Sequence, residues 1–236
     1  MGVFHFKKFD IDDNGCGMKI STDSVLLGAW FLPMHSAAHT LIDAGCGSGL
    51  LSLIAAQVCS DMQITAIEID IDAATAAKKN FAKTGWGRRL TLELRDFAEH
   101  TPNEPIDLII SNPPYFTTGI TSDDKTRALA RHQSGGLNYA TLVKSARKWL
   151  KPDGHLGFIS PSELEHEIIY EAELSQLKLR KLVRVHTAPS KAATRLLWDF
   201  SPKDGSYDTQ TLYLRNNDGS FTDEYISIVQ PFYTKI

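Results

Sequence analysis

The sequence lacks the cysteine pairs and the long apolar runs that mark secreted and membrane proteins. Three cysteines occur in 236 residues, at positions 16, 46 and 59, and none forms a C-x-x-C pair. This pattern argues against a disulfide scaffold and a zinc ribbon. No apolar run approaches the roughly 20 residues of a membrane-spanning helix, and the first residues, MGVFHFKKFD, contain no signal-peptide core. We therefore expect a cytoplasmic protein with no membrane partner.

Motifs for two common kinds of catalysis are also absent. The eight histidines form no H-E-x-x-H motif and no pair with the spacing of metal ligands. The sequence contains no G-x-S-x-G nucleophile elbow. We therefore expect neither a metal ion nor a covalent intermediate in the chemistry.

A surplus of positive charge is missing as well. The net charge is −3, whereas proteins that wrap nucleic acid non-specifically are usually basic. Six cations and no carboxylate occur between Lys178 and Arg195, and Arg127 and Arg131 lie four residues apart. These patches are either solvated surface or phosphate contacts, and we favour phosphate contacts because the chain as a whole is acidic. The expected RNA-contacting residues are Arg127, Arg131, Arg184, Lys191 and Arg195.

Apolar runs typical of strands alternate with amphipathic stretches typical of helices. A strand, a glycine-rich turn and a helix are expected over 38–58. The other expected strands are 63–70, 89–96, 105–112, 155–161, 177–186, 207–215 and 224–229. The other expected helices are 21–31, capped by Thr22 or Asp23, and 72–85, 138–154 and 162–175. This order predicts an α/β fold with helices on both faces of a parallel sheet, and ligands at the carboxyl ends of its strands.

No internal repeat and no convincing domain boundary interrupts the chain, so we expect a single domain over 1–236. Residues 1–20 are expected to pack as an N-terminal extension. The segment 117–136 is long for a loop in a compact domain, and loops of this length are often lids or binding segments. It comes just after the motif Asn112-Pro113-Pro114-Tyr115, which is unusual at the end of a strand, so we expect it on the substrate side. The alternative is a surface excursion with a short helix.

The turn D-A-G-C-G-S-G follows an apolar strand that ends near Asp43. Gly45 and Gly47 let the backbone turn tightly and approach a ligand closely. The spacing differs from the G-x-G-x-x-G of dinucleotide-binding proteins, which disfavours a nicotinamide dehydrogenase. A plain turn without a ligand is the alternative.

Acidic residues end the next two expected strands. Glu68 follows the glycine turn by about 20 residues, where an acid usually receives two ribose hydroxyls. Asp96 could accept a hydrogen bond from an adenine amine, and the ring of Phe97 could cover the base. Each acid could instead cap the helix that follows it, as could Asp70.

Together, in this order, these features resemble the class I S-adenosylmethionine-dependent methyltransferases. The resemblance implies a Rossmann-like fold with a mostly parallel seven-stranded sheet, helices on both faces and a C-terminal antiparallel strand. It also implies S-adenosylmethionine as the cofactor, with its methionine part in the glycine turn. The implied cofactor-binding residues are Asp43, near the amino end, and Gly45, Gly47, Glu68, Asp96 and Phe97.

The sequence Asn112-Pro113-Pro114-Tyr115 leaves the expected strand 105–112. An exocyclic amine on a base is a weak nucleophile, because its lone pair is delocalised into the ring. Acceptors on both N–H bonds would free that lone pair, and the Asn112 side chain and the Pro113 main chain each offer a carbonyl. The prolines hold these oxygens rigidly, and Tyr115 could stack on an extruded base, worth ~1–3 kcal/mol. The alternative is a proline-rich strand exit with an aromatic plug.

With the glycine turn and the acids, this motif resembles the amino-methyltransferases. The segments FKKFDIDDNGCGMKISTDSVLLGAWF, NPPYF, RALARHQ, LKPDGHLGFISPSEL and LRKLVRVHTAPSKAATRLL resemble the bacterial YfiC-type family of valine-tRNA adenine-N6 methyltransferases. That family implies methylation of adenine 37, beside the anticodon, and a tRNA substrate for a chain that we expect to be a monomer. The alternatives are a protein glutamine N5-methyltransferase, which uses the same motif, and a non-catalytic RNA-binding module.

Overall fold

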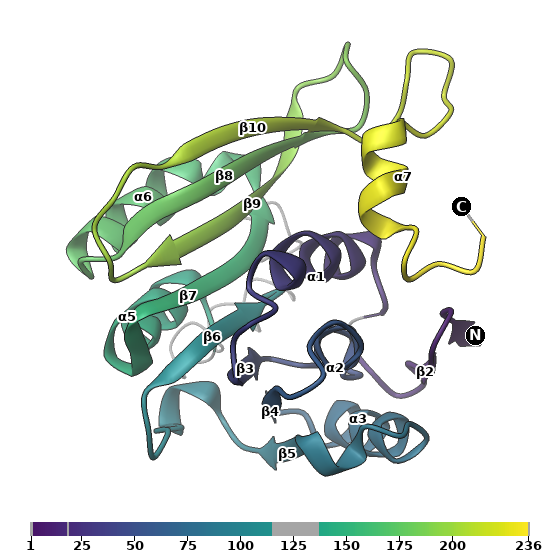
Figure 1. Cartoon of the computed structure of the whole chain (residues 1–236), viewed down its shortest axis with the longest axis vertical. Coiled ribbons are helices and arrows are strands. Elements are labelled where there is room, and N and C mark those ends of the chain that lie inside the picture. Colours follow the sequence, from purple (N-terminus) through teal and green to yellow (C-terminus); the bar gives the residue numbers. More distant parts are fainter. Residues whose placement is uncertain (1, 18, 115–136, 236) are drawn as a thin grey trace, which may run out of the picture.

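A computed structural model of the chain describes residues 2–17, 19–114 and 137–235. Its centre is an eight-stranded sheet (Figure 1). In spatial order the strands are β10 (Asp208–Tyr213), β8 (Lys178–His186), β9 (Ala193–Ser201), β7 (Leu150–Pro161), β6 (Ile106–Ser111), β3 (Thr40–Ala44), β4 (Gln63–Glu68) and β5 (Leu90–Leu94). A separate two-stranded hairpin consists of β1 (Val3–His5) and β2 (Asp10–Asp12).

Most neighbouring strands are parallel, which confirms the predicted sheet type. Parallel pairs join β7, β6, β3, β4 and β5 in succession, and a further parallel pair joins β10 and β8. Strand β9 is antiparallel to both β7 and β8. The sheet has eight strands, whereas the family resemblance implies seven. The last of them along the chain, β10, was expected at 207–215 and lies at the edge beyond β8, parallel to it.

Helices cover both faces of the sheet (Figure 1). One face carries α1 (Thr22–Met34), α2 (Leu50–Val58), α3 (Ile71–Ala82) and α7 (Asp223–Val229), and the other carries α5 (Tyr139–Trp149) and α6 (Glu165–Leu174). Three 3₁₀ turns are η1 (Gly87–Arg89), η2 (Phe97–Glu99) and η3 (Ser162–Leu164). Buried apolar side chains form one large cluster under the first set of helices and another under α5 and α6.

Strand β9 corrects the expected order of elements, because no strand is predicted from the sequence between 187 and 206. Leu197 packs in the cluster under α1, and Trp198 packs in the cluster under α5. Successive residues of a strand point to opposite faces, so a strand covered on both faces reads as a continuous apolar run without alternation. The cations between Lys178 and Arg195 precede the apolar part of β9, and from sequence alone they favour a charged surface segment over a buried strand.

Helix α7 replaces the strand expected at 224–229, and that prediction is wrong. The β-branched Ile226, Ile228 and Val229 favour a strand by composition. However, the Thr222 side chain accepts a hydrogen bond from the Tyr225 amide at 3.2 Å and so caps a helix. Tyr225 and Val229, four residues apart, are both buried on one side of that helix.

Two helix boundaries also differ from expectation. Helix α1 is capped by Ser21, whose Oγ accepts from the Ser24 amide at 3.3 Å, and not by Thr22 or Asp23. Helix α5 ends at Trp149 and the chain enters β7 at once, so the expected helix 138–154 is too long.

The N-terminal segment packs against the C-terminal segment. Phe6 and Phe9 are buried in the same cluster as α1 and α2, and Phe6 forms an isolated bridge with Tyr233. The Lys7 amide donates to the Phe232 carbonyl at 2.8 Å. Among the described residues, no helix has both the length and the apolar character that crossing a bilayer would require.

Candidate functional site

The glycine turn lies between the end of β3 and the start of α2. Gly45, Gly47 and Gly49 all have positive φ, at 69°, 57° and 88°, which a glycine adopts without strain. A Cβ at Gly45 would lie 2.7 Å from the Leu137 side chain, so packing also requires this glycine. A Cβ at Gly47 would meet no described atom within 4 Å. The turn therefore presents the Gly47 backbone to open space.

Asp43 connects the end of β3 to the first turns of α2. Its Oδ2 accepts hydrogen bonds from the amide and the hydroxyl of Ser52, at 3.0 and 2.6 Å. The side chain is fully buried, and Oδ1 makes no hydrogen bond with any described residue. Burial, and to a smaller extent the charge of Glu68, raise the pKa of Asp43 to about 7. A buried carboxylate oxygen without a partner is suited to a cationic ligand.

Glu68, at the end of β4, is held against the glycine turn. Its Oε2 accepts from the Gly47 amide at 2.8 Å, and its Oε1 accepts from the amides of Ile69 and Asp70, both at 2.9 Å. A carboxylate has about four acceptor positions, so three bonds leave room for a further donor. Asp70 caps α3 through the amides of Asp72 and Ala73.

Ile69 is a candidate that the sequence prediction missed. It follows Glu68 directly, and 63% of its surface is exposed, which is unusual for a large apolar side chain. The available signal was an isoleucine between two acids at a strand end. A ring bound beside Glu68 could be covered by this side chain.

Asp96 and Phe97 lie beyond the end of β5. The Asp96 carboxylate accepts from the Ala98 amide at 2.9 Å and caps η2, as the alternative interpretation proposes. Phe97 is 3% exposed, and its ring packs edge-on against Trp149 with the centroids 5.0 Å apart. This ring belongs to the core under α5 and is not presented at the surface.

Asn112 follows β6, beside the end of β3. The Ser111 hydroxyl donates to the Ala44 carbonyl at 2.7 Å, which joins the two strand ends. The Asn112 side chain is buried, and its Nδ2 donates to the Ser24 hydroxyl of α1 at 2.7 Å. This bond sets the orientation of the amide. Pro113 is buried and Pro114 is half-buried.

Ser24 is a second site residue that the sequence prediction missed. It lies 88 residues before Asn112, so no local pattern connects the two. Tyr115, Arg127 and Arg131, and the segment 117–136 that we expected on the substrate side, lie outside the described residues.

The remaining basic candidates lie at the same edge of the sheet as Asn112. Arg184, near the end of β8, makes two bonds of 2.5 Å with Glu165, which begins α6. Arg195, near the start of the antiparallel β9, contacts Asp23 of α1 at 2.8 Å. Lys191 is exposed in the turn between these strands. Carboxylates from α1 and α6 therefore balance two cations in a stretch that has none of its own.

Comparisons with known proteins show the fold class and the family of the chain. Residues 19–184 match the family model described as Methyltransferase small domain. The structure is similar to that of a predicted O-methyltransferase from Agrobacterium tumefaciens, with a TM-score of 0.68 and 17% identity, over 89% of this chain and 96% of that chain. It is also similar to a Listeria monocytogenes protein assigned to the class I S-adenosylmethionine-dependent methyltransferases. That comparison gives a TM-score of 0.60 and 16% identity, over 91% of this chain and 71% of that chain. The chain is a methyltransferase with the fold of the S-adenosylmethionine-dependent class.

A curated relative identifies the family. The chain is 41% identical, over 99% of its own length and 99% of the relative's, to the tRNA1(Val) (adenine(37)-N6)-methyltransferase of Shewanella woodyi. The chain belongs to the tRNA1(Val) (adenine(37)-N6)-methyltransferase family, which confirms the resemblance inferred from its motifs.

Proposed function

We propose that this chain transfers a methyl group from S-adenosylmethionine to N6 of adenine 37 in a valine tRNA. The observation that carries the proposal is the position of Asn112. It leaves β6 at the same sheet edge as the glycine turn, its amide is oriented by Ser24, and its neighbour Pro113 is buried. The name of the family member from Shewanella woodyi supports adenine 37 as the substrate.

The residues around the glycine turn fit this cofactor. Asp43 Oδ1 is a buried acceptor without a described partner, suited to the ammonium of the methionine part. Glu68 keeps acceptor capacity for a ribose hydroxyl, and the Gly47 backbone borders open space. Asp96, although it caps η2, remains our candidate for the adenine amine. The packing of Phe97 leaves Ile69 as the better cover for the base.

Asn112 and Pro113 would act on the amine of the substrate. When bound, S-adenosylmethionine supplies a methyl group on a sulfonium centre. The Asn112 side-chain carbonyl and the Pro113 main-chain carbonyl would accept hydrogen bonds from the two N–H groups of the adenine amine. These bonds would turn the nitrogen lone pair out of conjugation with the ring. These two residues would thus present the lone pair of N6 to the methyl group, and the methylated amine would lose one proton to water. Tyr115 would stack on the base, and Pro114 would keep both carbonyls rigid.

The tRNA would approach the edge that carries Arg184, Lys191 and Arg195. Anticodon loops present unstacked bases, so less energy is needed to extrude the target than in a duplex. We also propose that 1–236 acts as one domain, because the N-terminal segment shares the main core cluster.

Methyl transfer to unmodified tRNA, measured with labelled donor, tests the proposal. We expect the wild-type protein to label unmodified tRNA. Ribonuclease treatment of the product should release this label, and protease treatment should leave it in place. The Asn112→Ala variant should lose at least about 100-fold in kcat, because an oriented polar group lost from a transition state typically costs this much. Its affinity for S-adenosylhomocysteine, measured by calorimetry, should stay within about twofold of wild type. Label that resists ribonuclease and is lost with protease would instead indicate a protein substrate.

A further inference from the structure

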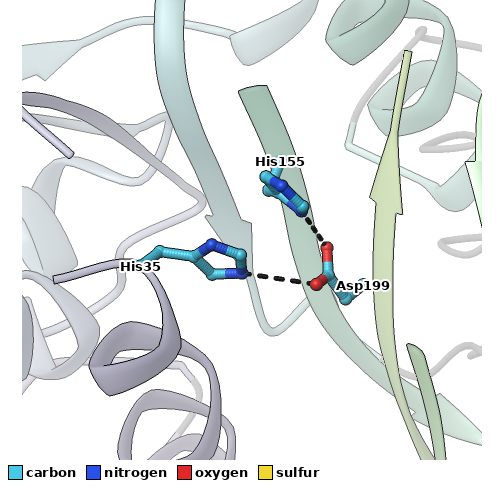
Figure 2. A group of neighbouring side chains, drawn as sticks. All are labelled: His35, His155 and Asp199. Carbon is cyan, nitrogen blue, oxygen red and sulfur yellow. Dashed lines mark hydrogen bonds and ion pairs between the residues drawn. The ribbon is translucent and has the colours of Figure 1, made fainter. Parts of the chain in front are cut away.

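Two histidines and an aspartate from three separate elements meet on one side of the sheet (Figure 2). His35 is the C-cap residue of α1, His155 belongs to β7 and Asp199 belongs to β9. Their three donor atoms all lie within 4.8 Å of one another. Because the residues are far apart in the sequence, no local spacing motif reveals them.

This cluster is separate from the candidate active site. His155 is in register with Leu108 of β6, four residues before Asn112. At about 3.3 Å per residue, this places the cluster about 13 Å along the strands from Asn112. Neither the cofactor residues nor the basic residues of the carboxyl edge take part in it.

The distances within the cluster are unequal. His155 Nδ1 lies 2.6 Å from Asp199 Oδ1, which is a short hydrogen bond. His35 Nε2 lies 3.3 Å from Asp199 Oδ2, is itself buried, and makes no hydrogen bond with the described residues. Both rings face the same carboxylate, as Figure 2 shows, and their centroids are 4.2 Å apart.

The separation of His35 from Asp199 is that of two ligands on one ion. Zinc binds imidazole nitrogen and carboxylate oxygen at about 2.0–2.1 Å in tetrahedral geometry, which places neighbouring ligand atoms about 3.3 Å apart. The buried His35 Nε2 contacts Asp199 without a hydrogen bond of good geometry, so its lone pair could be satisfied by an ion between the two residues.

The surroundings suit an ion as well. The Asp199 carboxylate is buried and faces both imidazoles, so it offers an oxygen ligand beside each of them. The ring of Phe31 lies 4.6 Å from the ring of His35 and forms an apolar wall on one side.

We propose that His35, His155 and Asp199 bind one divalent transition-metal ion, with zinc as the preferred occupant. Two imidazoles and one carboxylate are a set that zinc favours, and a water molecule completes the four ligands. The ion fastens the C-terminal end of α1 to β7 and β9. Its role is structural and does not depend on the proposed methyl transfer.

Binding replaces a proton with the ion. In the ion-free protein His155 Nδ1 and Asp199 Oδ1 are joined by a hydrogen bond. On coordination the proton of this hydrogen bond leaves to solvent, and one oxygen of Asp199 and one nitrogen of each imidazole bind the ion. Affinity should therefore fall as the pH decreases.

Cobalt(II) titration of the untagged, metal-free full chain tests the site. We expect one cobalt per chain with the intense visible absorption of tetrahedral coordination, and displacement of the band by zinc. In the same protein, zinc at a hundredfold excess over its Kd should raise the melting temperature by about 5–10 °C. A chelator should reverse this shift.

Matched variants assign the ligands. His35→Gln, which removes the imidazole that is not hydrogen-bonded to Asp199, should abolish the cobalt band and the zinc shift while the chain still melts cooperatively. Asp199→Asn should do the same. His39→Gln, in an exposed residue near the same end of α1, should leave both signals unchanged. A wild-type chain without the band, or a band that survives His35→Gln, would overturn the proposal. Variants that lower the melting temperature with no metal dependence in wild type would show a proton-linked clasp only, and would overturn it too.

Discussion

Asp43 is a carboxyl group whose charge changes near neutral pH. Burial raises its pKa to about 7, whereas the unfolded carboxyl ionises near pH 4. Between these values the folded chain holds a proton that the unfolded chain has released. The contribution of Asp43 to stability therefore falls as pH rises from about 4 to about 7. A bound ammonium group would favour the ionised form and couple cofactor binding to this proton.

The affinity for S-adenosylhomocysteine should therefore rise with pH. If only the ionised Asp43 binds the ammonium group, affinity increases about tenfold or more between pH 5.5 and 7.5. Asn at this position keeps an acceptor for Ser52 and removes the charge, so Asp43→Asn should bind more weakly with a flat pH profile. Calorimetry at several pH values measures both. An unchanged pH dependence in the variant would exclude Asp43 as the coupled group.

Ser24 should position Asn112 without touching the substrate. In Ser24→Ala the Asn112 amide loses the 2.7 Å bond that orients it. A lost hydrogen bond of about 1–1.5 kcal/mol corresponds to roughly a 5- to 10-fold decrease in kcat. Ser24→Thr keeps the hydroxyl and should restore most of the rate. Cofactor affinity should be unchanged in both, and a Ser24→Ala enzyme with wild-type kcat would contradict this role.

Residues that act within one short segment were predictable from sequence. The glycine turn and the end of β4 at Glu68 are local, because a strand end and a run of glycines are readable without knowing their neighbours. The partners Ser24, Glu165 and Asp23 were not, because each contacts a residue from a distant segment. The same applies to Phe97, whose burial depends on Trp149.

At the level of elements, Asn80 connects α3 with two other parts of the fold. Its Nδ2 donates to the carbonyls of Asp12 and Ser48, both at 2.9 Å, and its Oδ1 accepts from the Asp12 amide at 3.0 Å. These bonds join β2, the glycine turn and α3. The side chain is fully buried, so its hydrogen bonds cannot be replaced by bulk water without rearrangement.

Asn80→Ala should therefore destabilise the chain by about 2–3 kcal/mol, because one buried and two part-buried backbone groups lose their partner. Urea unfolding measures the change. Cofactor affinity should fall as well, since Ser48 belongs to the glycine turn. Asn103, which is exposed, offers the control substitution Asn103→Ala, for which we expect a change below about 0.5 kcal/mol. Equal effects of the two substitutions would refute the linking role of Asn80.

The two misassigned elements have a common physical cause. Composition and alternation report on one chain segment, whereas β9 and α7 are decided by what covers them. Leu197 and Trp198 are buried on opposite faces because helices cover both sides of β9. Tyr225 and Val229 are buried because α7 packs on α1. The central strands β3, β4 and β6 were predictable because their apolar runs end in turn residues that stop them.

At the scale of the whole molecule, α1 joins the two sites. Its 13 residues span about 20 Å. Ser24 in its first turn orients Asn112, and His35 at its C-cap belongs to the proposed metal site. An ion that fixes the C-terminal end of α1 would therefore also restrict the motion of Ser24 at its N-terminal end, and so the orientation of Asn112.

At the carboxyl edge of the sheet, Arg184, Lys191 and Arg195 are the cations that our proposal places beside the tRNA. Two of its cations, Arg184 and Arg195, already contact carboxylates, so Lys191 should contribute most freely to phosphate binding. Lys191→Ala should weaken tRNA binding several-fold and reduce the salt slope of log K by about 0.7–1, with an unchanged melting temperature. Lys79→Ala, in an exposed position of α3 beside the far edge strand, should leave both quantities unaltered. Filter binding at several salt concentrations decides the matter: if the two lysines behave alike, the tRNA does not approach this edge through Lys191.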